Sequence, residues 1–219
     1  MLKEYNHIKL ADFEANTIDN FANAEADVIR VKLLASSENE FIMQKQGFLF
    51  ADRTIKVSIS VNKCSLDLDK FIRLPIEETK NYKEDIFKIA VDSFLYDRRF
   101  HILPQCNREV AAAVLQEWIN GLDDVLVCKY KDKVIGFLAL KETEHDSLFV
   151  HLAAVDAKYR LMGAAMALYA QAIKTAKERG YKKLEGRISS QNMAVMNIYA
   201  TLGASFSEAQ DIFLKEVTK

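Results

Sequence analysis

Runs of mostly apolar residues alternate along the chain with amphipathic stretches, and this alternation predicts a mixed α/β protein. Apolar runs that lack a clean period of two indicate strands buried on both faces. Apolar residues spaced three and four apart indicate helices that cover a sheet. The expected strands are 28–34, 49–60, 125–130, 134–140, 148–155, 184–188 and 206–215. The expected helices are 38–45, 77–94, 108–120, 163–179 and 192–202, with 98–107 irregular.

Short polar segments predict where these elements end. Lys131-Asp132-Lys133 separates two apolar runs and predicts a tight hairpin turn. Gly180 follows an amphipathic stretch and is typical of a helix C-cap. Leu74-Pro75 predicts a boundary between an N-terminal part and the rest of the chain.

One weak similarity relates two parts of the chain. The segment 31–39 followed by Gly47-Phe48 resembles the segment 184–192 followed by Gly203-Ala204. Both read strand, Ser-Ser, helix, glycine, strand, and the second copy is expected to be about one helical turn longer. Two interpretations stay open: a degenerate half-domain packed on a full one, or the general likeness of any β-α-β unit.

Composition narrows the classes of function. Half of the residues are apolar and the formal net charge is −1, so a sizeable core is expected and a nucleic-acid partner is not. No apolar run approaches the ~20 residues that span a bilayer, and none forms a signal peptide, so we expect a cytoplasmic protein without membrane partners. Cys64, Cys106 and Cys128 are odd in number and widely spaced, so neither a metal site nor a disulfide framework is expected.

The segment from Arg160 to Ala165 has the build of an anion site. It follows an apolar strand and opens an amphipathic helix, whose first backbone N–H groups are unpaired and carry a partial positive charge. Gly163, Ala164 and Ala165 are small enough to let a pyrophosphate approach these amides, and Arg160 adds a cation. Small residues also open ordinary helices, so the pattern alone leaves both interpretations open.

Two motifs together resemble the GNAT superfamily of N-acetyltransferases. The first is Val155-Asp156-x-x-Tyr159-Arg160-x-x-Gly163, and the second is Asn192-x6-Tyr199-x3-Gly203 before a final strand. The resemblance implies the GNAT fold, a mixed α/β fold with a central, mostly antiparallel sheet and flanking helices. It also implies acetyl-CoA or another short acyl-CoA as co-substrate. The residues expected to hold it are Ala153, Val155, Arg160, Leu161, Met162, Gly163, Ala164, Ala165 and Asn192. Asn192 also suits a plain N-cap, and both roles can coexist.

A narrower resemblance covers most of the chain. Gly47-Phe48-x-x-x-Asp52, Arg99-Phe100-His101 and Trp118-Ile119-x-Gly121 are similar to the nucleotide-sugar N-acyltransferases, such as the dTDP-fucosamine acetyltransferases. It implies a truncated GNAT-like subdomain at 1–75, a catalytic domain at 76–219 and a homodimer. It also implies that the acceptor is a dTDP-linked amino-deoxy sugar used in surface polysaccharide synthesis. The transferred group would be acetyl or another short acyl group such as 3-hydroxybutyryl. The acceptor pocket would contain Arg99, Phe100, His101 and Trp118.

The same resemblance implies direct attack of an amine on the thioester, with the carbonyl polarised at a bulge in the strand 148–155. Tyr199 is then the general acid. A phenol has a pKa near ~10 and a thiol a pKa near ~8.5, so proton transfer to the departing thiolate is not steeply uphill. His151 is the candidate base. The alternatives are a packed tyrosine, a histidine packed in the sheet, and a water relay. Other acceptors (a polyamine, a peptide or an antibiotic amine) and a silent CoA-binding module are the competing functions.

Overall fold

The computed structural model describes residues 1–15, 18, 21–23, 25–94, 97–104, 106–122, 124–143 and 146–217. The strands are β1 (Leu2–Tyr5), β2 (Ile8–Ala15), β3 (Val28–Leu34), β4 (Leu49–Ser60), β5 (Ile76–Thr79), β6 (Asp124–Tyr130), β7 (Lys133–Glu142), β8 (Ser147–Val155), β9 (Lys183–Ser189) and β10 (Ser205–Glu216). The α-helices are α1 (Ser37–Lys45), α2 (Lys83–Ser93), α3 (Arg98–His101), α4 (Arg108–Asn120), α5 (Ala164–Glu178) and α6 (Met193–Thr201). Three short 3₁₀ segments are η1 (Val61–Lys63), η2 (Leu68–Lys70) and η3 (Ala157–Met162).

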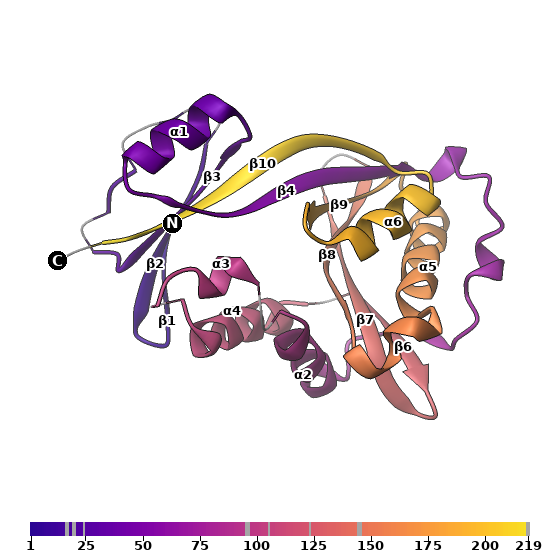
Figure 1. Cartoon of the computed structure of the whole chain (residues 1–219). Coiled ribbons are helices and arrows are strands. Elements are labelled where there is room, and N and C mark those ends of the chain that lie inside the picture. Colours follow the sequence, from indigo (N-terminus) through magenta and orange to yellow (C-terminus); the bar gives the residue numbers. More distant parts are fainter. Residues whose placement is uncertain are drawn as a thin grey trace.

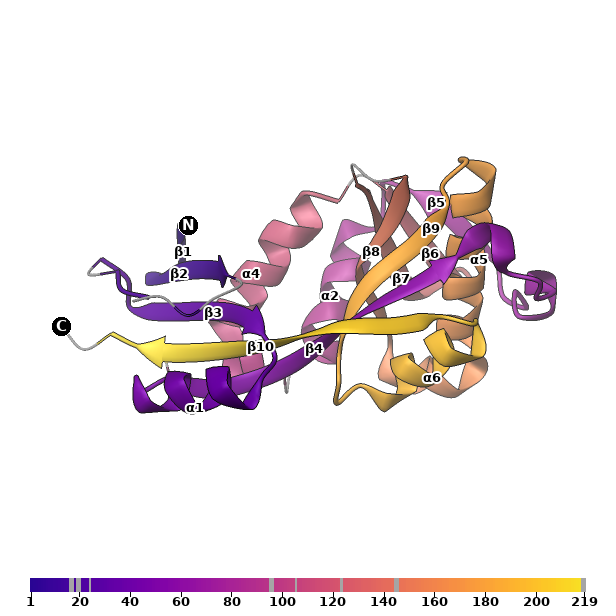
Figure 2. The same cartoon turned by 90° about the horizontal axis from the view of Figure 1, so that it is seen from above.

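These strands form one sheet in the order β1-β2-β3-β10-β4-β9-β8-β7-β6-β5. Only the β2–β3 and β8–β9 pairs of this sheet are parallel, so the predicted mostly antiparallel α/β fold is confirmed. The long strands β4 and β10 lie side by side and join the two ends of the molecule (Figures 1 and 2). The N-terminal strands therefore share one sheet with the rest of the chain, and a domain boundary at residue 75 stays a prediction.

Helices cover both faces of the β6–β9 half of the sheet. Along β7, Leu138 and Leu140 pack with α5, whereas Phe137 and Ala139 pack with α2 and α4. Because successive side chains of a strand point to opposite faces, α5 lies on one face and α2 and α4 on the other. Figure 2 shows this arrangement, with β7 between α2 and α5. The apolar runs predicted to be buried on both faces owe their pattern to these two layers.

The structure corrects three local predictions. Residues 77–79, expected to be helical, belong to β5, which pairs with β6 at the edge of the sheet. The exposed Glu77 and Glu78 suit an edge strand, because charged side chains discourage pairing with another chain. The segment 98–107, expected to be irregular, begins with helix α3, whose N-cap is Asp97. Strands β1 and β2 were not predicted; positive φ angles at Asn6 and His7 form the turn that joins them.

The two similar segments have equivalent structures, offset by 156 residues from Ser36 to Asn192 and from Gly47 to Gly203. Ser36 and Asn192 each accept a hydrogen bond from the backbone N–H three residues ahead, and α1 and α6 have nine residues each. Gly47 and Gly203 have φ angles of 81° and 78°. The second copy was expected to be about one helical turn longer, and this expectation is wrong, because the two helices are equally long. Exchanging the copies turns the strand order β3-β10-β4-β9 into its reverse, so a local two-fold axis lies between β4 and β10.

Candidate active site

The site begins where two parallel strands separate. β8 and β9 pair from Ser147 and Lys183 as far as Val150 and Gly186, and their last residues are no longer paired. A cavity of about 510 Å³ lies at this point. Its lining residues are Asp52, Thr54, Ser93, Phe94, Asp97, Arg98, Arg99, Trp118, Val150, His151, Leu152, Ala153, Tyr169, Arg187, Ile188, Ser189, Gln191, Asn192, Val195 and Tyr199.

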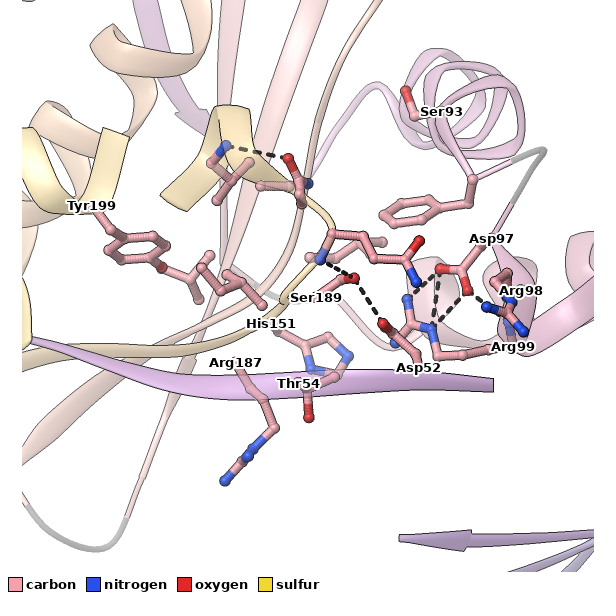
Figure 3. Close-up of a pocket in the computed structure, with 18 of the residues that line it drawn as sticks. Asp52, Thr54, Ser93, Asp97, Arg98, Arg99, His151, Arg187, Ser189 and Tyr199 are labelled. Atoms are coloured by element: carbon pink, nitrogen blue, oxygen red, sulfur yellow. Dashed lines mark hydrogen bonds and ion pairs between the residues drawn. The ribbon is translucent and has the colours of Figure 1, made fainter. Parts of the chain in front are cut away.

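The cavity is lined from both faces of the sheet. Tyr169 and Tyr199 come from α5 and α6, which share one core with the sheet, whereas Trp118 comes from α4 on the opposite face. Figure 3 shows Tyr199 at one end, Asp52 and Asp97 at the other, and His151 between them. A molecule that approaches from one face can therefore meet a molecule that approaches from the other at the separation of β8 and β9.

Tyr199 is fully buried at the α5–α6 end of this cavity. Its ring lies 4.9 Å from the ring of Tyr169 in an edge-on arrangement. Its hydroxyl has no hydrogen-bond partner among the described residues. A Cβ atom at Gly186 would lie 2.7 Å from this hydroxyl, so only glycine leaves room for the phenol. Burial raises the pKa of Tyr199 well above its usual value, so the phenol keeps its proton at neutral pH.

His151 occupies a β-bulge at the same place. β7 residues Ala139 and Leu140 are consecutive, but they pair with Leu152 and Val150, so His151 is the extra residue of β8. A bulge leaves the extra residue outside the ladder, which frees its backbone N–H to polarise a carbonyl. The imidazole ring lies 5.9 Å from the ring of Trp118. Although His151 is exposed, desolvation by the atoms around it, and then the charge of Lys141, lower its pKa, so the neutral ring is available to accept a proton.

A polar cluster forms the other end of the cavity. Asp52 is 5% exposed, and its Oδ1 accepts a hydrogen bond of 2.9 Å from Oγ of Ser189. Nε of Arg99 donates to both carboxylate oxygens of Asp97, at 2.9 and 3.0 Å, and its Nη2 also binds Asp97. Burial raises the pKa of Asp52, against the hydrogen bond from Ser189 and the charge of Arg99. The guanidinium of Arg99 is thus neutralised within the protein.

The start of α5 has open backbone donors. Its N-cap is Gly163, with a φ of 79°, and no side chain caps the first turn. Ala164, the first residue of α5, is fully buried. Leu161 and Met162 of η3 are exposed, and Arg160 reaches back to the carbonyl of Val155 at 3.4 Å. The first N–H groups of α5 can therefore bind an anion, as the sequence pattern predicts.

The remaining predicted residues are only partly brought together. Asn192 caps α6 by accepting from the N–H of Val195 at 3.2 Å, and it also lines the cavity. Ala153, Arg99 and Trp118 line the cavity too, whereas the segment from Val155 to Ala165 lies outside its lining. His101 is exposed and is not a lining residue. The side chain of Phe100 lies outside the described part, so its role stays a prediction.

Sequence reasoning missed the carboxylates of the cavity. Asp52 was noted only as part of a motif, and Asp97 and Ser189 were not singled out. Asp52 is brought beside Ser189 because Thr54 of β4 pairs with Ser189 of β9. These strands are more than a hundred residues apart in the chain, so no local pattern gives the contact.

Comparisons with known proteins identify the family. The sequence model of the acetyltransferase (GNAT) family matches residues 84–204, which is a little over half of the chain. The chain therefore belongs to the GNAT family of acetyltransferases. Comparison with curated proteins gave no match. No helix of the described residues is long and apolar enough to cross a membrane, and no three of their His, Cys, Asp or Glu side chains cluster as metal ligands would.

Solved structures share the fold at low identity. A GCN5-related N-acetyltransferase from Sphaerobacter thermophilus has a TM-score of 0.60 and 15% identity, over 88% of this chain and 60% of that one. An acetyltransferase of the GNAT family from Novosphingobium aromaticivorans has a TM-score of 0.59 and 13% identity, over 89% of this chain and 77% of that one. A glucosamine N-acetyltransferase region of a fungal multi-domain β-N-acetylglucosaminidase has a TM-score of 0.55 and 12% identity, over 85% of this chain and 25% of that one. The chain thus spans less than two thirds of the Sphaerobacter protein.

Proposed function

We propose that the protein is an acyl-CoA-dependent N-acyltransferase whose acceptor is an amino sugar linked to a nucleotide diphosphate. The observation that carries the proposal is the cavity at the separation of β8 and β9. It joins a buried phenol, which has no hydrogen-bond partner among the described residues, on one face of the sheet to a polar region lined by Trp118 on the other. Family membership supports acyl transfer from coenzyme A, and the polar opening supports a hydrophilic acceptor.

The acyl-CoA is proposed to bind on the α5–α6 side. Its pyrophosphate would meet the uncapped N–H groups at the start of α5, beside Arg160. The amide oxygens and N–H groups of pantetheine would run along the free edge of β8 toward the bulge. There the backbone at His151 would polarise the thioester carbonyl. Asn192 contributes as the cap that fixes the start of α6.

The transfer step uses two side chains. The acceptor ammonium loses a proton to the neutral imidazole of His151, and the amine nitrogen then forms a bond to the thioester carbon. The carbon–sulfur bond breaks, and the thiolate takes a proton from Tyr199. The second proton of the attacking nitrogen restores the phenol, and His151 releases its own proton to solvent. Because burial raises the pKa of Tyr199, we expect it to contribute near the low end of the usual ~10²–10⁴-fold range.

A nucleotide diphosphate needs a cation that no carboxylate already neutralises. Arg99 pairs with Asp97, and Nη2 of Arg187 lies 3.7 Å from the Glu208 carboxylate. Arg98 donates to a neutral group, the carbonyl of Phe50, at 3.2 Å. Among the described arginines of the lining, Arg98 is therefore the best candidate for the diphosphate. Trp118 offers an aromatic face to a sugar or base.

An amino sugar is also an acceptor that one protein of this fold is described as using, namely the fungal glucosamine N-acetyltransferase region. That region shares the fold with this chain at 12% identity. This similarity therefore supports only that the fold is compatible with an amino-sugar acceptor. The choice of an amino sugar for this chain rests on the residues of the cavity.

A second acceptor class is a polyamine or an aminoglycoside. The observation in its favour is that Asp52 and Asp97 both line the cavity, which places two carboxylates where the sequence suggested none. Carboxylates attract the extra positive charges of such acceptors.

The test is thiol release from acetyl-CoA and 3-hydroxybutyryl-CoA with a panel of amines. The panel contains dTDP- and UDP-linked amino-deoxyhexoses, spermidine, an aminoglycoside and a lysine peptide. Turnover with one nucleotide-linked amino sugar supports the proposal, and the preferred donor identifies the acyl group. Turnover with spermidine or the aminoglycoside alone refutes the sugar and supports the second class. Binding of CoA without turnover of any pair supports a silent CoA-binding module.

A further inference from the structure

We propose that Asp52 is the specificity-determining residue for the acceptor, and that its carboxylate binds a second hydrogen-bond donor of the acceptor, about 10 Å from the amine that reacts. This inference rests on the proposed transfer of an acyl group to an amine, but not on which amine is used. The donor is a hydroxyl or a protonated amino group.

The distance follows from the register of the sheet. Val150, Gly186 and Val57 form one row across β8, β9 and β4, and the row lies at the bulge. Ser189 and Thr54 form a second row, three residues further along both β9 and β4. At roughly 3.3 Å per residue the rows are about 10 Å apart. Ser189, from which the Asp52 carboxylate accepts, lies in the second row, so Asp52 is placed beside a part of the acceptor remote from the attacking nitrogen.

The charges of the cluster favour a donor over an anion. Asp52 and Asp97 supply two carboxylates, and Arg99, the cation beside them, is bound by Asp97. Oδ1 of Asp52 accepts from Ser189, and the backbone N–H of Arg53 also donates to this carboxylate. A carboxylate is an acceptor with several lone pairs, so Oδ2 can take a hydrogen bond from a bound molecule.

An independent feature marks this space as a binding site. Tyr199 lines the same cavity, and its hydroxyl is fully buried and has no partner among the described residues. Leaving such a group unpaired is unfavourable, and proteins seldom do so without a functional reason. Figure 3 shows Asp52 and Tyr199 at opposite ends of the cavity. One end is thus suited to the chemistry and the other to recognition.

The decisive variant is Asp52→Asn, which removes the charge and keeps an oxygen that can accept from Ser189. The acceptor is the amine of the panel above that is turned over best. We expect its KM to rise about 10- to 150-fold, the range for hydrogen bonds to charged groups. We expect kcat to change less than about 3-fold and the KM for acyl-CoA to stay unchanged. The matched control is Asp69→Asn, an exposed carboxylate whose partner is Lys174 on α5. It should leave all three constants unchanged.

Other results would overturn the inference. Equal KM values for wild type and Asp52→Asn would refute it, as would a loss confined to kcat, which places Asp52 at the reacting atoms. If Asp52→Asn does not fold, the wild-type enzyme is tested with butylamine, which has no second hydrogen-bond donor. A kcat/KM for butylamine equal to the values for spermidine and for the amino sugars refutes a second contact.

The outcome for Asp52 can be separated from the outcome for the proposed function. Turnover of spermidine that depends on Asp52, with no turnover of the nucleotide-linked sugars, supports the inference and refutes the sugar. If no amine is turned over, binding of spermidine and of the dTDP-linked amino sugars is measured by calorimetry. Equal binding to wild type and Asp52→Asn, or no binding to wild type, refutes the inference.

Discussion

Removing the hydroxyl of Tyr199 is expected to change stability and activity in opposite directions. The hydroxyl is buried, has no partner among the described residues and lies 2.7 Å from where a Cβ atom at position 186 of β9 would be. A buried polar group without a partner costs about 1–3 kcal/mol, so Tyr199→Phe should gain part of that. A gain of about 1 kcal/mol raises the Tm of a chain of this size by about 2–4 °C. The same change should lower kcat roughly 10²-fold, which is about 2.7 kcal/mol of barrier.

The two effects are measured separately. Thermal unfolding followed by circular dichroism gives the Tm, and thiol release with saturating donor and acceptor gives kcat. The affinity for acyl-CoA should stay unchanged, because the lost group acts only as the thiolate leaves. A tyrosine that merely packs predicts a shift in Tm with unaltered turnover. Unaltered turnover would therefore refute the role of Tyr199 as the acid, and a lower Tm would refute the account of the unpaired hydroxyl.

Three further changes test neighbouring parts of the structure. Gly186→Ala should lower the free energy of unfolding by about 1–3 kcal/mol, because the added methyl group would overpack against Tyr199. The loss should be much smaller in a Tyr199→Phe background, and a double-mutant cycle by urea denaturation measures the difference. Because the pKa of His151 is lowered, kcat/KM plotted against pH should fall on its acidic side with a pKa below ~6.5. His151→Asn should remove this fall, and a fall that persists identifies another base. Arg53→Met leaves the fully buried Asp211 without its 2.6 Å ion pair and should lower the free energy of unfolding by about 3–5 kcal/mol. Urea denaturation measures this free energy, and a loss below about 1 kcal/mol contradicts the prediction.

Elements with strong local signals were predicted closely. The strand 28–34, the strand 49–60 and the helix 108–120 match β3, β4 and α4 residue for residue. Their apolar spacing, and the asparagine cap before α4, are properties of neighbouring residues alone. The edge strand β5 was missed because its sequence, Ile-Glu-Glu-Thr, has no strand pattern of its own, and only pairing with β6 makes it extended.

The candidate site was predictable where a motif carries it and not where the sheet does. Gly163 at the start of α5 and Asn192 at the start of α6 are at the positions the motifs imply. His101 was expected in the acceptor pocket on a short motif, but it lies exposed at the end of α3. Asp52 joins the cavity only because β4 pairs with β9 across the sheet. Contacts of this kind depend on topology, which the spacing of residues does not contain.

The interleaving of β3, β10 and β4 also governs the order in which the molecule can form. β10 lies between β3 and β4, although about 145 residues of chain separate it from β4. During synthesis, β3 and β4 are made long before the strand that joins them, and their facing edges stay open until β10 emerges. Such distant pairings slow folding and expose strand edges to other chains. The early half of the chain thus depends on the last strand for its closure.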